Sequence, residues 1–129
     1  MDPHRNLPPG HRGIRLADVP TSSVVVASMR DRETLGRCLA ALVPACTARA
    51  IEVVVARNCS GDEYRALEMA WPAVLFMPAP DHATVRQLRA IGLSAADGDV
   101  VTLIEDGVIP DADWIAQLPG PNDPPAPAI

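Results

Sequence analysis

The feature that most constrains the fold is an alternation of short β-branched runs with helical patterns. Apolar runs of strand length occupy residues 23–27, 51–56, 74–77 and 100–104. Between them lie segments with apolar residues at intervals of three and four, which is typical of amphipathic helices. The sequence therefore predicts four strands that alternate with four helices.

The expected helices cover residues 32–43, 62–71, 82–96 and 111–118. Pro44 and Pro72 are expected to end the first two helices, because proline lacks a backbone N–H and crowds the preceding turn. Strands built almost entirely of Val, Ile and Leu are expected to be buried on both faces. The predicted fold class is therefore α/β: a Rossmann-like three-layer sandwich whose mostly parallel four-stranded sheet has helices on both faces.

Proline-rich ends frame a single predicted domain in this chain of 129 residues. Residues 1–20 hold four prolines and little apolar pattern, and residues 119–129 read PGPNDPPAPAI. Neither composition favours a helix or an interior strand. We expect a flexible N-terminal arm over 1–20, a domain over 21–118 and a flexible tail over 119–129.

Charge and composition exclude several classes of function. The formal net charge is -5, which disfavours binding to a nucleic-acid backbone. All 11 cationic side chains are arginine, so a P-loop lysine is ruled out. No apolar run approaches the roughly 20 residues of a membrane span, and residues 1–13 lack the apolar core of a signal peptide. We therefore expect no membrane span and a cytoplasmic protein. The three cysteines match no zinc or redox spacing and are expected to be free thiols.

Ligands of parallel α/β sheets bind beyond the carboxyl ends of the strands, near the point where the strand order reverses. The loops to consider are therefore 28–31, 57–62, 78–82 and 105–107. None has the glycine pattern of a dinucleotide-binding or phosphate-binding loop. The second loop reads RNCSGD and offers Asn58, Ser60 and Asp62 to a ligand, although Asp62 is equally suited to cap the next helix. Two acids, Glu105 and Asp106, directly follow the fourth strand, where unpaired carboxylates are costly.

The order of these elements and loops resembles the family 2 glycosyltransferases, which have the GT-A fold. The resemblance covers about residues 22–118. It is carried by SVVVASMRDRETLGRCLAAL for the first strand and helix, IEVVVARNCSGD for the second strand and its loop, and VRQLRAIGLSAADGDVVTLIEDGVIPDADWI for the third helix, the fourth strand and an acidic motif. The fold so implied is a GT-A-type domain truncated to its N-terminal, nucleotide-sugar-binding half.

The resemblance implies binding of a nucleotide-diphospho-sugar and transfer of its sugar to an acceptor hydroxyl. The positions that match the family's binding residues are Ser28, Arg30, Arg57, Asn58, Asp62, Arg89, Glu105 and Asp106. A divalent ion, Mn²⁺ or Mg²⁺, would be held by Asp106 and Glu105 and would neutralise charge on the departing diphosphate. No residue is assigned as the general base, and the acceptor half would come from a partner glycosyltransferase chain or a second copy.

Several positions depart from the family pattern. Gly107 stands where the acidic motif has its last metal ligand, and Gly has no side chain to donate. Arg30 and Arg57 stand where the family has Asn and Asp, and Ala90 replaces the Asn of a triplet in the third helix. Three interpretations follow: a glycosyltransferase or half of one, a non-catalytic interaction domain with an open edge at its fourth strand, and a domain in which arginines replace the metal at a phosphorylated ligand.

Overall fold

The computed structural model describes residues 21–119; the arm and tail expected at the two ends lie outside these residues, apart from Pro119. Its four strands are β1 (Ser22–Ser28), β2 (Glu52–Arg57), β3 (Val74–Pro78) and β4 (Val100–Glu105). They form one sheet in the order β3-β2-β1-β4, and every neighbouring pair is parallel. The predicted parallel α/β sheet is therefore confirmed.

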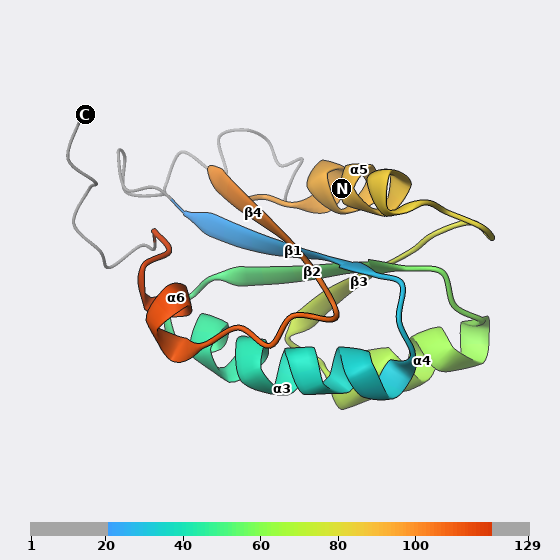
Figure 1. Ribbon diagram of the computed structural model, residues 1–129, viewed down its shortest axis with the longest axis horizontal. Helices are drawn as coiled ribbons and strands as arrows, with labels where there is room; N and C mark the ends of the chain where they lie inside the picture. Colours follow the sequence, from blue (N-terminus) through green and yellow to red (C-terminus); the bar gives the residue numbers. More distant parts are fainter. Residues whose placement is uncertain (1–20, 120–129) are drawn as a thin grey trace.

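Helices cover both faces of this sheet. The helices are α3 (Arg32–Ala48), α4 (Gly61–Ala70), α5 (Val85–Ala95) and α6 (Ala112–Ala116). Figure 1 shows α5 on one side of the sheet and α3, α4 and α6 on the other. This arrangement confirms the three-layer sandwich. None of the described helices is long and apolar enough to cross a membrane.

The larger core lies between the sheet and α3, with contributions from α4 and α6. Alternate residues of β1 and β2, such as Val24 and Val55, meet Leu35 and Leu39 of α3 there. A smaller core under α5 is built from Ala27, Ala56, Ala83 and Leu88. The small side chains on this face let α5 approach closely, and a Cβ added at Gly92 would overlap Val25.

Several expected helix boundaries are wrong. Pro44 does not end the first helix, because α3 continues through it to Ala48. Pro44 is exposed, whereas Leu42, Val43 and Cys46 around it are buried. Packing of this continuous apolar face outweighs the local cost of about 3 kcal/mol for an interior proline.

The third helix begins at Val85 and not at the expected His82, which lies in the preceding loop with a φ of 63°. Thr84 is its N-cap and forms a capping box with Gln87. The last helix is also shorter than expected, since it spans only Ala112–Ala116. The T-x-x-Q pattern is the local signal that marks the start of α5.

Strand β4 lies at one edge of the sheet, as expected, and no strand among residues 21–119 pairs with its outward side. The expectation that every strand is buried on both faces is wrong for β3, where Leu75 is 43% exposed, and above all for β4. Its side chains are exposed or half-buried, whereas every residue of β1 is buried. The cause is the layer arrangement, because α5 contacts β1, β2 and β3 and leaves β4 largely uncovered.

Candidate functional site

The candidate site lies at the carboxyl end of the sheet, where the strand order reverses. The chain goes from β1 to β2 and β3 on one side, and then returns to place β4 on the other side of β1. Residues that follow β1 and β4 therefore meet at the position that corresponds to the ligand-binding crevice of α/β proteins. Ser28 ends β1, and Asp106 follows β4.

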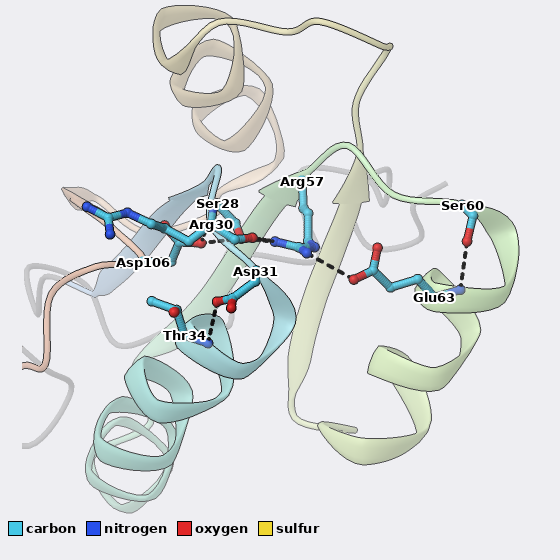
Figure 2. Close-up of polar contacts among 8 residues, drawn as sticks. All are labelled: Ser28, Arg30, Asp31, Thr34, Arg57, Ser60, Glu63 and Asp106. Carbon is cyan, nitrogen blue, oxygen red and sulfur yellow. Dashed lines mark hydrogen bonds and ion pairs between the residues drawn. The ribbon is translucent and has the colours of Figure 1, made fainter.

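Three buried polar side chains connect the ends of β1, β2 and β4 (Figure 2). The Ser28 hydroxyl donates to Asp106 Oδ2 at 2.7 Å and accepts a hydrogen bond from Arg57 Nη1 at 2.8 Å. The backbone N–H of Arg30 also donates to Asp106 Oδ2, at 2.9 Å. Ser28 therefore links the buried carboxylate of Asp106 to the buried guanidinium of Arg57.

Arg57 is held by partners from two further segments. Its Nη1 donates to the Arg30 carbonyl oxygen at 2.6 Å, and its Nη2 pairs with Glu63 Oε2 of α4 at 2.9 Å. Arg57 is only 8% exposed. Its Nε has no hydrogen-bond partner among residues 21–119. Sequence analysis did not select Glu63; the S-x-x-E pattern that starts at Ser60 is the signal that places it in the first turn of α4.

The Arg30 side chain differs from that of Arg57 in its exposure and in its partners. It is exposed, and Figure 2 shows it extending away from Arg57 and toward solvent. It passes over Gly107, where an added Cβ would lie 3.3 Å from Arg30 Nη2. In the described part of the chain this guanidinium forms no ion pair. Among residues 21–119 it is therefore an exposed cation beside the loop that follows β4.

The other predicted site residues do not join this cluster. Glu105 pairs with Arg89 of α5 at 2.9 Å, on the opposite face of the sheet from Ser28. Asn58 is exposed in the loop after β2. Asp62 is also exposed and pairs with Arg65 at 2.6 Å. The structure therefore gathers Ser28, Arg30, Arg57 and Asp106, and leaves the remaining four positions apart from them.

Helix caps account for two polar residues in these loops. The N-cap of α4 is Ser60, whose hydroxyl accepts from the Glu63 backbone N–H, so the alternative that Asp62 caps this helix is wrong. Asp31 caps α3 by accepting from the Thr34 backbone N–H at 3.0 Å. The hydrogen bond to Thr34 lowers the pKa of the Asp31 carboxyl. Both side chains therefore have a structural task at a helix N-terminus.

A divalent metal does not fit the predicted pair of carboxylates. Consecutive strand residues point to opposite faces, and the bonds of Glu105 and Asp106 show that these two side chains do so here. Asp106 is 1% exposed, and its Oδ2 already accepts two hydrogen bonds. Within residues 21–119 no group of three or more His, Cys, Asp and Glu side chains is placed to hold a metal ion.

The cysteines lie outside the site, and none is in a disulfide. Cys38 and Cys46 are buried in the larger core, and burial raises the pKa of each thiol to about 11. Burial also raises the pKa of Cys59, which is partly exposed in the loop after β2. Thiols with raised pKa values remain protonated near neutral pH and are weak nucleophiles.

Comparisons with known proteins do not assign this chain to a family. No protein-family model matches it, and no curated protein matches it in a sequence search. A proposal for its function therefore depends on the position and chemistry of the crevice and on the order of its motifs.

Proposed function

We propose that this domain binds a nucleotide-diphospho-sugar, in the manner of family 2 glycosyltransferases, and holds the diphosphate with arginine instead of a metal. The observation that carries the proposal is the exposed guanidinium of Arg30 above Gly107, which forms no ion pair with residues 21–119 and lies where the strand order reverses. Ligands of such sheets bind at this point. Sugar transfer itself would require acceptor-binding residues and a general base, which we do not assign.

The chemistry of the crevice supports a phosphorylated ligand. A guanidinium can bind two phosphate oxygens at once, and the resulting hydrogen bonds are charge-assisted. Arg30 has the freedom to do this, since its side chain is exposed. Arg57 is instead committed to Ser28 and Glu63, and it serves to fix the backbone of Arg30 through the carbonyl oxygen.

The proposal is tested by binding of uridine, thymidine and guanosine diphosphates, with and without manganese, measured by thermal shift and calorimetry. We expect one diphosphate to bind equally well with and without manganese. Arg30→Gln should weaken that binding about tenfold or more, since a hydrogen bond to a charged group contributes about 1.5–3 kcal/mol. Arg37→Gln is the matched control, because Arg37 lies on the exposed side of α3 and pairs with Glu33.

The variant Gly107→Asp distinguishes diphosphate binding by Arg30 from diphosphate binding through a metal ion. Gly107 has no positive φ, so the backbone accepts a side chain, and the new carboxylate would lie beside the Arg30 guanidinium. If Arg30 binds the diphosphate, this variant should weaken binding. If a metal does so, the added carboxylate should strengthen manganese-dependent binding, and the proposal of a metal-free site would be wrong. Absence of binding by every diphosphate would refute the nucleotide proposal as a whole.

A further inference from the structure

The open edge of β4 has backbone groups available to another strand. The Val100 N–H donates to the Thr21 carbonyl oxygen at 2.9 Å, so even-numbered residues of β4 direct their N–H and C=O groups at β1. Successive residues of a strand alternate in this direction. The odd-numbered residues Val101, Leu103 and Glu105 therefore direct their N–H and C=O groups to the open side, which no described strand pairs.

Strand β4 has few of the features that discourage strand pairing. Such features include proline, lysine, a bulge and an inward-pointing charge. Strand β4 reads VVTLIE, and the charge of its one acid, Glu105, is paired with Arg89. At the opposite edge of the sheet, β3 ends in Pro78. The contrast marks β4 as the edge that is suited to pairing.

Apolar side chains surround the β4 edge on both faces of the sheet. A groove of about 450 Å³ runs along it, lined by Leu103, Ile104, Val108, Ile109 and Trp114 among others. Leu103 is 41% exposed and Ile109 is 57% exposed. On the α5 face, Leu93 is also exposed, and it lies one turn after Arg89, which reaches β4 through Glu105. These side chains would lose water contact if a strand added to β4.

We infer that a second copy of this chain pairs with the β4 edge, antiparallel and about a two-fold axis at Leu103. The result is a continuous eight-stranded sheet, four strands from each copy. The interaction is isologous, so each copy covers the edge of the other and no open β4 edge is left. This interface supports the interpretation of the chain as an interaction domain, and it does not depend on the proposed nucleotide site.

Backbone direction and charge select the register. Only the odd-numbered residues direct their N–H and C=O groups to the open side, so an odd-numbered residue of one copy must lie opposite an odd-numbered residue of the other. Two registers pair five residues of β4 in this way, with the axis at Thr102 or at Leu103. An axis at Thr102 places Asp99 opposite Glu105 of the second copy, and like charges in that position are unfavourable. An axis at Leu103 places Glu105 opposite Val101 and the two Leu103 side chains side by side.

The sheet itself offers a matched control for this interface. Leu75, Val54, Val25 and Leu103 form one row across the sheet on the α5 face. Leu75 of β3 and Leu103 of β4 are the two ends of this row, and they are 43% and 41% exposed. Leu103→Arg should convert a dimer to a monomer in size-exclusion chromatography with light scattering. Leu75→Arg should leave the dimer intact, and circular dichroism checks that both variants are folded.

A cross-link tests the register without relying on a disruptive variant. Residues of a hydrogen-bonded antiparallel pair have Cα atoms about 5.5 Å apart, which is within the range of a disulfide. In a Cys59→Ser background, Leu103→Cys should therefore give a disulfide-linked dimer on mild oxidation, and Leu75→Cys should not. A monomeric wild-type protein, a dimer that survives Leu103→Arg, or equal cross-linking at both positions would overturn the inference.

Discussion

Replacement of Asp106 tests whether this carboxylate is part of the fold or is reserved for a ligand. Asp106 is 1% exposed and accepts hydrogen bonds from the Ser28 hydroxyl and the Arg30 backbone N–H. Asp106→Ala leaves both donors without their acceptor and removes the negative charge nearest to Ser28. A buried donor without a partner costs about 1–3 kcal/mol, and loss of one partner of a buried charged network costs about 3–5 kcal/mol. We therefore expect Asp106→Ala to lower the free energy of unfolding by about 3–5 kcal/mol.

Asp106→Asn gives a graded comparison, because it keeps the shape and one carbonyl oxygen but removes the charge. Charge-assisted hydrogen bonds are roughly twice as strong as neutral ones, so we expect a loss of about 2 kcal/mol. Asp62→Ala is the control, since its surface pair with Arg65 is worth less than about 1 kcal/mol. The assay is urea unfolding followed by circular dichroism, with no metal and no nucleotide added.

The opposite result is informative. A carboxylate kept for a ligand is commonly a burden on the ligand-free protein, and its removal then has little cost or increases stability. If Asp106→Ala unfolds at the same urea concentration as the unmodified protein, the buried network does not stabilise the fold. The conclusion that Asp106 stabilises the fold would then be wrong, and a role in ligand binding would be the better interpretation.

Two further predictions concern packing and pH. Gly92→Ala should destabilise the protein by about 1–3 kcal/mol, because the added Cβ would overlap Val25. Gly36→Ala in α3 should be stabilising, because its added Cβ meets no atom within 4 Å. Equal effects of the two variants in urea unfolding would contradict the close approach of α5 to the sheet. The free energy of unfolding should fall between about pH 9 and pH 11, because the pKa values of Cys38 and Cys46 rise from 9.0 to about 11 in the folded protein and only the unfolded chain releases these protons in that range. A variant with alanine at both cysteines should show a smaller fall in urea titrations across this range, and an unchanged slope would rule out the thiols as its source.

The sheet could be predicted from the sequence because its signal is local and repeated. Each strand is a run of β-branched residues, and each intervening segment has a helical period, so element types follow from short windows. The predicted end of the first helix was wrong because two local signals competed. Pro44 indicates an end, but Leu42, Val43 and Cys46 continue the buried face of α3 through it. At α4 and α5 the capping patterns that begin at Ser60 and Thr84 were present in the sequence and give the correct starts.

The site could be predicted only in part. The loops that supply Ser28, Arg57 and Asp106 were selected because they follow the carboxyl ends of parallel strands, and the structure brings these three side chains together. The hydrogen-bond partner of each side chain depends on how separate elements pack together, which residue spacing within one element does not determine. Strand alternation places Glu105 and Asp106 on opposite faces of the sheet, but it does not say that their partners are Arg89 of α5 and Ser28 of β1. The pairing of Arg57 with Glu63 likewise depends on where α4 begins.

Three of the positions that depart from the resembled family, Arg30, Arg57 and Gly107, are linked to one another in the structure. Arg57 brings a positive charge to Asp106 through Ser28, so the buried carboxylate has a counter-charge without a metal. The absence of a side chain at Gly107 leaves room for the Arg30 guanidinium to lie over the loop after β4. A carboxylate at Gly107 would lie beside that guanidinium and pair with it. Arg30, Arg57 and Gly107 are therefore best understood as a single rearrangement of charge, in which one arginine stabilises the acid inside the fold and another presents a positive charge at the crevice.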